Sequence, residues 1–578
     1  MSNSKRGVSA PTQEAEQVET KLGLTHTNTS HRSELSRIHS AQHLDDVSVY
    51  PNSVDAGHSD MEMKFAQDHE VEAQHEGQNH VPEARLDTRN VRDLEANESE
   101  KKETVLSTKD PNLISWDGTD DPANPKNWTL GRKWAATVVV SFFTFISPVS
   151  SSMVAPALNA IAKEFDIKSE VESQLVLSIF VLAYAIGPLF WGPMSEVYGR
   201  VPILQSSNLF YVVFNVACGA SKTKGQMIAF RFLSGLGGSA PLAVGGGVLG
   251  DCWRSEERGR AISTYSLAPL LGPAIGPIAG GFIAENTTWR WVFWATSLAA
   301  GLIQISGLFL LRETYPPILL HRKAEKLRKE SGNASLHTEF EDPQRSLANI
   351  MKHSLVRPFV MLGTQPIVQA LAIYAAYLYG IMYLVLSTFP TLWETVYKES
   401  VGVGGLNYIS LGVGFFLGAQ ITAPINDRVY RRLKFKNNNV GRPEFRVPVM
   451  IPGSLLVPIG LFIYAWTAEK HTHWIGPNLG AAIFTAGVII GFQSVQTYLV
   501  DAYTRFAASA IAAATVLRSL AGFGFPLFAP AMYNGLGYGW GNSLLGFIAF
   551  SLGVPAPFVI WFYGQKLRER STFAAGGD

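Results

Sequence analysis

Two copies of one charged motif offer the clearest chemistry in the sequence. In "GPMSEVYGR", Glu196 precedes Arg200 by four residues. In "APINDRVYR", Asp427 precedes Arg431 by the same spacing. A carboxylate near the end of an apolar segment needs a partner, and a cation four residues away lies within one helical turn. Each pair either marks the boundary with water or forms a conformational latch, and the duplication favours the latch. Gly192, in the first copy, would permit close helix approach.

Two arginines interrupt apolar runs. Arg231 lies in "RFLSGLGG" and Arg518 lies in "SAIAAATVLRS". An arginine inside a membrane segment is costly unless a partner or water offsets its desolvation, so it indicates a functional site by default. For Arg231, the alternative is a side chain that reaches the membrane interface. Arg518 needs an anion, a cluster of carbonyl groups or water.

A glycine-rich stretch, "LGPAIGPIAGG", has the composition of a bendable, closely packed helix. Glycines four residues apart form a groove for another helix, and prolines bend the helix that carries them. This combination predicts a gating helix. Its residues are Gly272, Gly276, Pro277, Gly280 and Gly281.

Neutral polar and aromatic residues gather in the second part of the chain. Hydrogen-bonding amides and rings that face a cavity would suit amphipathic or aromatic ligands. Each residue alone could instead form a hydrogen bond between neighbouring helices or, for a tyrosine, lie at the membrane interface. As a set they favour a substrate cavity over a narrow ion pore. The predicted cavity residues are Gln365, Gln369, Tyr377, Gln493, Gln496 and Arg518.

The scaffold that positions these residues is predicted to lie in a membrane. Of the 578 residues, 47% are hydrophobic and 16% are charged, whereas soluble domains carry roughly 25% charged residues. Apolar runs approach the roughly 20 residues that a helix needs to cross a bilayer. We predict an all-α, polytopic fold of about twelve spans, near residues 134–154, 173–195, 201–220, 226–250, 261–284, 289–311, 363–390, 402–424, 447–467, 474–499, 505–533 and 541–563.

Polar stretches divide this scaffold into parts. The expected parts are a disordered N-terminal tail (1–126), a six-helix bundle (127–311), a central loop (312–362), a second six-helix bundle (363–565) and a C-terminal tail (566–578). Lysine and arginine collect in the loop after the eighth span, in the central loop and at the C-terminus. Because basic loops stay on the cytoplasmic side, both termini and the central loop are expected there.

Several function classes have no support in the sequence. A net charge of +1 gives no reason to expect nucleic acid. No phosphate-binding lysine motif is present, and the histidines between residues 26 and 80 are irregularly spaced, so neither ATP hydrolysis nor a metal site is expected. Cys218 and Cys252 lie on either side of one predicted span, which excludes a disulfide framework. We therefore expect a monomeric non-enzyme without cofactor.

The acid that would carry a proton stays open. Glu196, Asp251, Asp427 and Asp501 are the candidates, and all lie near predicted membrane edges. For Asp501 we expect a position at the extracellular boundary rather than deep in the membrane.

Together these motifs resemble the major facilitator superfamily, and within it the twelve-span drug:proton antiporters of fungi. The resemblance covers about residues 121–570. "GPMSEVYGR" is similar to the motif after the second span, although Glu196 replaces the usual aspartate and Val197 a usual arginine. "RFLSGLGG" is similar to a fourth-span motif, which implies that Arg231 takes part in proton coupling with an acid such as Asp251. "GPAIGPIAGG" is similar to the fifth-span antiporter motif and favours export.

The resemblance implies two six-helix bundles around a central cavity, with protons driving export of drugs, fungicides or a toxic secondary metabolite across the plasma membrane. Uptake or polyamine transport by the same fold is an alternative. Polyamines should require acidic residues in the cavity, which the centres of the first, seventh and tenth spans lack. A membrane sensor that signals through its long tail is a further alternative.

Overall fold

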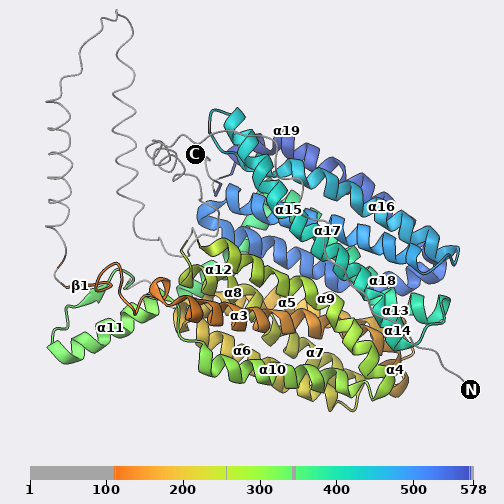
Figure 1. The fold of residues 1–578 in the computed structure, drawn as a ribbon, viewed down its shortest axis with the longest axis horizontal. Helices are drawn as coiled ribbons and strands as arrows, with labels where there is room; N and C mark the ends of the chain where they lie inside the picture. The colour runs from red at the N-terminus through yellow and green to blue at the C-terminus, as the bar shows by residue number, and fades with distance from the viewer. Residues whose placement is uncertain (1–109, 111, 255–256, 342–346, 572, 575–578) are drawn as a thin grey trace, which may run out of the picture. The chain divides into compact units, whose positions relative to one another are not determined.

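Long α-helices make up most of the residues that the structure describes, as the apolar runs predict (Figure 1). The computed structural model describes residues 110, 112–254, 257–341, 347–571 and 573–574. A helix satisfies its own backbone N–H and C=O groups, which a segment in hydrocarbon requires. The predicted all-α membrane fold is confirmed.

The first half of the bundle contains six helical segments that are long and apolar enough to cross a membrane. The short η2 helix (Ala155–Ala157) joins α3 to α4, and α7 runs into α8, so each pair forms one segment. The helices are α3 (Leu130–Ser152), α4 (Leu158–Glu164), α5 (Glu170–Tyr198), α6 (Arg200–Gly219), α7 (Lys224–Gly238), α8 (Ala240–Cys252), α9 (Arg258–Asn286) and α10 (Arg290–Leu310).

The second half, teal to blue in Figure 1, lies above the first half in that view. Its helices are α13 (Pro366–Thr391), α14 (Val401–Leu406), α15 (Tyr408–Lys436), α16 (Met450–Glu469), α17 (Ile475–Ala502), α18 (Ala507–Ile548) and α19 (Pro555–Glu569). Short helical turns connect them: η3 (Leu392–Val396), η4 (Pro443–Val449), η5 (Thr504–Phe506) and η6 (Ala549–Gly553).

Two spans occupy the last helical stretch. The described residues contain eleven membrane-capable segments, and the last, Thr504–Glu569, is 66 residues long. A continuous helix of that length would reach about 99 Å, roughly three times the hydrocarbon core of a bilayer. Gly537, with φ 69° and ψ 178°, breaks the helix. The break falls between the predicted eleventh and twelfth spans, so the prediction of about twelve spans is confirmed.

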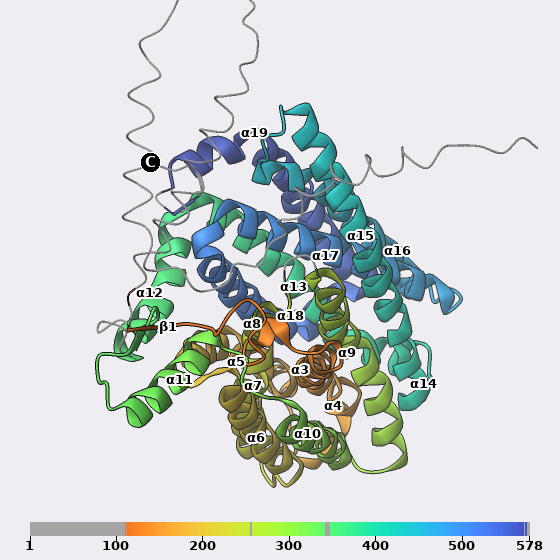
Figure 2. The ribbon, with the colours of Figure 1, turned by 60° about the vertical axis from the view of Figure 1, so that its left-hand side comes forward.

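Helices also form in the stretch between the halves. It contains α11 (Pro316–Ser331), β2 (His337–Thr338) and α12 (Leu347–Thr364). Strand β1 (Leu113–Ile114), which precedes the first span, pairs in parallel with β2. Figures 1 and 2 both show β1 beside α11. Two segments that lie far apart in the sequence, on either side of the first half, therefore meet at this end of the bundle.

The stretch just before the first span is ordered, which differs from the predicted tail boundary at residue 126. Asp121 accepts hydrogen bonds from the N–H groups of Asp117 (2.9 Å) and Ala123 (2.8 Å). The bond from Asp117 is the main reason that the pKa of Asp121 is lowered. Lys323 of α11 contacts Asp117 at 2.6 Å. Order here depends on this distant partner, which local composition does not reveal; residues 1–109 and 111 lie outside the described residues.

The two halves share one apolar core. Its buried side chains include Met153 and Val181 from the first half and Ile381 and Tyr383 from the second. Between membrane helices, such close packing supplies van der Waals contact rather than escape from water. The halves therefore pack directly on each other through much of the bundle.

Candidate functional site

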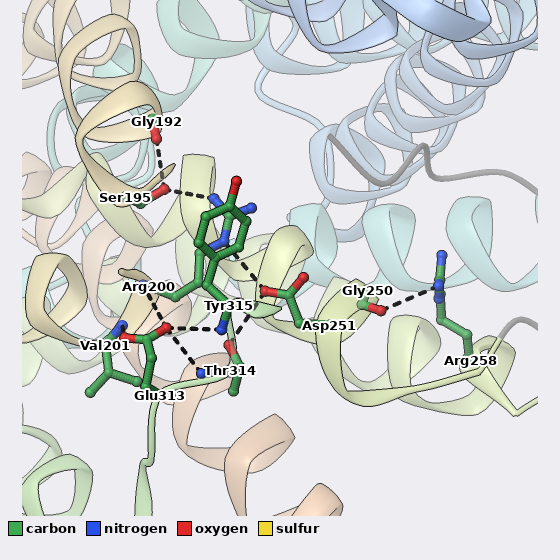
Figure 3. A network of polar contacts seen from close by, with 10 residues as sticks. All are labelled: Gly192, Ser195, Arg200, Val201, Gly250, Asp251, Arg258, Glu313, Thr314 and Tyr315. Atoms are coloured by element: carbon green, nitrogen blue, oxygen red, sulfur yellow. Dashed lines mark hydrogen bonds and ion pairs between the residues drawn. The ribbon is translucent and has the colours of Figure 1, made fainter. Parts of the chain in front are cut away.

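Arg200, the first residue of α6, is the centre of a buried polar network (Figure 3). Its Nη1 donates to Ser195 Oγ at 2.7 Å, and its Nε lies 3.4 Å from Oδ2 of Asp251. Its guanidinium carbon lies 4.5 Å from the ring centroid of Tyr315. We name five residues the first charge cluster: Ser195, Arg200, Asp251, Glu313 and Tyr315. The cluster ties the end of α5 to the end of α8 and to the stretch before α11.

Glu313 fixes the start of α6. Its Oε1 accepts from the backbone N–H of Arg200 at 3.0 Å, and its Oε2 accepts from that of Val201 at 3.3 Å. A carboxylate is stabilised at a helix N-terminus because the first N–H groups have no helical partner. Gly199 makes the preceding turn with φ +102°, a region that favours glycine. A Cβ at Gly199 would also collide with the Glu313 carboxylate.

A cavity of about 340 Å³ lies beside the first charge cluster, with walls from α5 and α8 of the first half and from α12 and α18. Glu196, Arg200 and Asp251 all line it. Gly192 lines it too, and a Cβ there would meet no atom within 4 Å in the described part of the chain. Among the described residues of this structure no other helix lies close to Gly192, so close helix approach at this position stays a prediction. The missing side chain of Gly192 leaves room in the cavity.

Arg446, in η4, is the centre of a matching network in the second half. Its Nε donates to Asp501 Oδ2 at 2.8 Å and its Nη1 donates to Asp427 Oδ1 at 3.0 Å. The guanidinium carbon lies 4.2 Å from the ring centroid of Tyr430. We name Asp427, Tyr430, Arg446 and Asp501 the second charge cluster. Arg431, the partner that the motif predicted for Asp427, is exposed and its Nε reaches only the backbone oxygen of Asp427, at 3.4 Å.

The two clusters occupy equivalent places in their halves. In each, an arginine just before or at the start of the third helix contacts an acid at the end of the fourth. Asp501 is thus the counterpart of Asp251. Asp501 lies at the same end of the bundle as Asp427, because both contact Arg446, whereas the sequence pattern predicted the two acids at opposite ends. Counting helices within each half would have identified Arg446 and Asp501 from sequence; Glu313 begins the stretch "ETYPPILL" after the sixth predicted span, but no role was predicted for it.

Arg231 of α7 is fully buried and binds backbone carbonyl groups. Its donors reach the oxygens of Val176 at 3.1 Å, Ser150 at 3.1 Å and Ser151 at 3.4 Å. Its guanidinium carbon lies 4.4 Å from the Phe180 ring centroid. Within the described residues Arg231 forms no ion pair. The alternative that Arg231 reaches the membrane interface does not fit this enclosed position.

The predicted cavity residues lie at different levels of the second half. Gln365 directly precedes α13 and its side chain makes no capping hydrogen bond, and Gln369 donates to the Gly363 carbonyl at 3.0 Å. Twelve residues separate Gln365 from Tyr377, a rise of about 18 Å along a helix. Tyr377 is buried, and among the described residues its hydroxyl has no hydrogen-bond partner.

Two further predicted cavity residues lie on α17. Gln493 is half-buried, and its Oε1 is buried without a partner in the described chain, whereas Gln496 is exposed. Arg518 of α18 is half-buried between Tyr379 and Phe492. The 340 Å³ cavity is lined by none of the six predicted residues.

The glycines of α9 lie against two other helices. A Cβ added at Gly272 would lie 2.6 Å from the Cβ of Pro148 in α3, and a Cβ added at Gly276 would lie 2.7 Å from the Val149 oxygen. Gly280 likewise meets the Met153 backbone. Gly281 faces α14 of the second half, with 2.8 Å between its added Cβ and the Val401 oxygen. The helix predicted from "GPAIGPIAGG" therefore makes close contacts both within its half and across to the other.

Polar contacts join the halves at one end. We name the end where α3 begins and α19 ends the terminus end, and the opposite end the far end. At the far end, Asn159 donates to Glu394 at 2.9 Å and Asn534 donates to Glu170 at 3.0 Å. Glu285, near the end of α9, accepts from the N–H of Gly402 at 2.7 Å. These polar contacts join the halves at the far end, and the cavity beside the first charge cluster lies between α5 and α8 and the helices α12 and α18 at the terminus end.

The described residues offer no place for a metal ion among His, Cys, Asp and Glu side chains. Cys218 and Cys252 are buried free thiols. The polar chemistry of the bundle therefore rests on carboxylates, guanidinium groups, hydroxyls and amides.

Comparison with protein families gives one match that covers about two thirds of the chain. Residues 140–526 match the family described as the Major Facilitator Superfamily. The chain is 54% identical over 490 residues to the efflux pump vrtL of Penicillium aethiopicum, which covers 83% of this chain and 97% of that protein. It is 45% identical over 466 residues to the efflux pump radE of Floropilus chiversii, which covers 80% of this chain and 86% of that protein.

Solved structures agree on the fold. The xylose transporter XylE from E. coli, in a partially occluded inward-open conformation, matches with a TM-score of 0.55 at 18% identity. That match covers 75% of this chain and 98% of XylE. A bacterial homologue of the human lysosomal transporter Spinster matches with the same TM-score at 14% identity, covering 76% of this chain and 98% of that one.

Proposed function

Because the chain belongs to the Major Facilitator Superfamily, we propose that it is a proton-coupled antiporter that exports small organic molecules across the plasma membrane. It is a multi-pass membrane transporter and not an enzyme. The relatives named efflux pumps support export as the direction. Basic residues in the last turns of α15 support cytoplasmic termini, since such residues collect on the cytoplasmic side. The terminus end then faces the cytoplasm.

The observation that carries this proposal is the asymmetry between the two ends of the bundle. The far end is joined across the halves by Glu285, Glu394 and Glu170 and their partners. The cavity at the terminus end lies between α5 and α8 on one side and α12 and α18 on the other. This is the arrangement expected of an exporter that is ready to take its substrate from the cytoplasm, and rocking of the halves would exchange the open end.

Glu196 is the proposed latch of the closed terminus end. It lines the cavity together with Ala507, Ala508 and Ser509, the first three residues of α18. Closure would bring the Glu196 carboxylate toward this helix N-terminus, where free N–H groups and the helix dipole stabilise negative charge. The first charge cluster would hold α5, α6 and α8 as one unit during that movement, and the second cluster would do the same for α15, η4 and α17.

Asp251 is the proposed proton carrier, with Arg231 as a coupling residue. Asp251 is buried beside Arg200 and lines the cavity, so a proton could reach it from the terminus end. Arg231, held by carbonyl groups of α3 and α5, links the two helices that flank the far part of the path. Among the acidic residues of the six membrane-capable segments described for the first half, Asp251 is the most buried, which favours it for this role.

The proposal is tested with the full-length chain in proteoliposomes under an imposed pH gradient, with anionic, neutral and cationic aromatic probes. At least one probe should accumulate against its gradient, and a protonophore should abolish accumulation. Asp251→Asn should lose gradient-driven accumulation but keep exchange of labelled for unlabelled probe, since exchange needs no net proton movement. Arg231→Ala should lose both activities.

Asp166→Asn is the matched control, because Asp166 is exposed at a loop and its side chain is 84% exposed in its ion pair. It should behave as the natural chain does. Accumulation that continues without a pH gradient would refute proton coupling. Wild-type accumulation by Asp251→Asn would remove Asp251 from the mechanism, and absence of accumulation for every probe would contradict the transport proposal.

A further inference from the structure

Arg518 is a guanidinium deep in the bundle for which the described residues supply no acidic partner. Its charged carbon lies 5.3 Å from the ring centroid of Tyr379 on α13 and 5.9 Å from that of Phe492 on α17. Its Nε is buried and, in the described chain, without a hydrogen-bond partner. A buried donor left without a partner is costly, so such a group indicates a site that a ligand or water completes.

The side chain lies close to the proposed path. Thr515, Arg518 and Gly522 are spaced to share one face of α18. Thr515 lines the 340 Å³ cavity. A Cβ on Gly522 would lie 2.7 Å from the Tyr379 ring and 3.1 Å from Val181 of the first half. Arg518 is therefore one turn beyond a cavity-lining residue and one turn before the contact between the halves, about 17 Å from the start of α18.

The charge balance of the bundle interior is positive. In the membrane-capable segments that the structure describes, every Asp and Glu except Asp427 lies within three residues of a segment end. Asp427 lies nine residues from the end of its segment. The Asp427 side chain is 62% exposed, whereas Arg231 and Arg518, the eighth and fifteenth residues of their segments, are buried and half-buried. Charges interact strongly where water is scarce, so this interior favours an anion over a neutral molecule or a cation.

The two arginines differ in how they are satisfied. Arg231 donates to three carbonyl oxygens, so its charge is already solvated by the backbone. For Arg518, by contrast, the described contacts are the faces of two aromatic rings, which leave the directional N–H groups available. Of the two, Arg518 is the one equipped to bind a ligand.

We propose that Arg518 is an anion subsite of the transport path, and that the exported molecules carry an acidic oxygen next to an aromatic ring. The acidic oxygen, as a carboxylate, enolate or phenolate, would accept hydrogen bonds from the guanidinium. The ring would pack against Tyr379 and Phe492. The inference rests on the proposed export function and adds the substrate class.

Three probes with one ring system and different charges test this subsite: 2-naphthoate, 2-naphthylmethanol and 2-naphthylmethylammonium. Equilibrium binding is measured on the full-length chain in detergent micelles at neutral pH. We expect the natural chain to bind the anion at least about tenfold more tightly than the alcohol, as one charge-assisted hydrogen bond supplies. Arg518→Gln should remove that preference and leave binding of the alcohol within about twofold. Arg518→Lys should keep part of the preference.

Alcohol binding serves as the folding control for each variant. If Arg518→Gln also loses the alcohol, Arg518→Lys decides, since it keeps the charge and most of the volume: retained anion preference supports the subsite and lost preference overturns it. Equal affinity of the natural chain for anion and alcohol, tighter binding of the cation, or a preference that survives in Arg518→Gln also overturns it. Export of neutral probes alone would refute the subsite and leave the transport proposal intact. Anion binding without any export would support the subsite and refute the transport proposal.

Discussion

At the scale of single residues, Arg446 is the side chain on which the second charge cluster depends. Arg446 and Asp501 are 8% and 11% exposed, whereas the second partner, Asp427, is 62% exposed. Removing one member of a buried pair leaves the other charge uncompensated. We predict that Arg446→Gln destabilises the purified protein by about 3 kcal/mol and strongly reduces export. Thermal unfolding in detergent and probe export from the same preparation measure both effects.

Arg431→Gln is the matched control for Arg446→Gln, because it removes the same group from an exposed position near the same acid. Exposed charges contribute little, so we expect a change of less than about 0.5 kcal/mol and normal export. If Arg431→Gln were as damaging as Arg446→Gln, the motif spacing and not the observed contacts would identify the partner of Asp427.

The pairing of Asp427 shows where prediction from residues stops. The four-residue spacing predicts that Arg431 lies one helical turn from Asp427, and both residues do lie on α15. However, α15 continues to Lys436, and Arg431 lies on the exposed side of that helix. Arg446, which belongs to the next segment, donates to Asp427 instead. The sequence thus locates the acids and the deep arginines, but a contact between different helices depends on tertiary packing that spacing does not encode.

At the scale of secondary-structure elements, α9 is a helix whose packing is sensitive to added volume. A Cβ on Gly276 would collide with Ser152 Oγ and lie 2.7 Å from the Val149 oxygen of α3. A backbone oxygen cannot move aside without moving the helix. We predict that Gly276→Ala costs about 1–3 kcal/mol in stability and slows export, because it would displace α9, which contacts the second half at Gly281. Unfolding and export assays on purified protein measure these changes.

Gly301→Ala in α10 provides the comparison, since a Cβ there would have nothing within 4 Å among the described residues. Alanine also favours the helix by roughly 0.5–1 kcal/mol over glycine, so this variant should be as stable as the natural chain or slightly more so. Equal losses in both variants would mean that the contact between α9 and α3 does not determine the result, because an alanine at Gly301 makes no such contact.

Elements were the most predictable level of this protein. Apolar runs long enough to cross a bilayer placed the spans, and glycine spacing identified α9, because both follow from local physical requirements of a helix in lipid. The segment around β1 was not predicted. Its structure depends on Lys323 and on β2, which follow the entire first half of the bundle in the sequence. Local composition cannot predict contacts with such distant partners.

At the scale of the whole molecule, the two-half organisation could be read from the repeated charged motif, whereas the relative position of the halves could not. A repeated motif indicates that two bundles have the same architecture. It does not indicate at which end the halves are joined, because the two conformations of a transporter, each open at one end, have the same sequence and differ by a small free energy. The contacts of Glu170, Glu285 and Glu394 at the far end supply that information here.

If transport requires the far end to open, a covalent link across it should stop transport. Glu170 and Asn534 are both exposed and belong to different halves, with 3.0 Å between their polar atoms. We predict that Glu170→Cys with Asn534→Cys, joined by a short cleavable bifunctional thiol reagent, reduces export to background and that a reductant restores it. Cys218 and Cys252 are buried, so they should react little with the reagent.

Glu172→Cys with Lys224→Cys is the control pair, because these residues face each other at 2.7 Å within the first half. A link inside one rigid unit restrains no motion between the halves, so export should continue. The two pairs share exposure, reagent and end of the bundle, and they differ only in whether the link crosses between halves. Normal export through a linked Glu170–Asn534 pair would therefore show that the far end stays closed during transport, and alternating access between the two ends would fail for this protein.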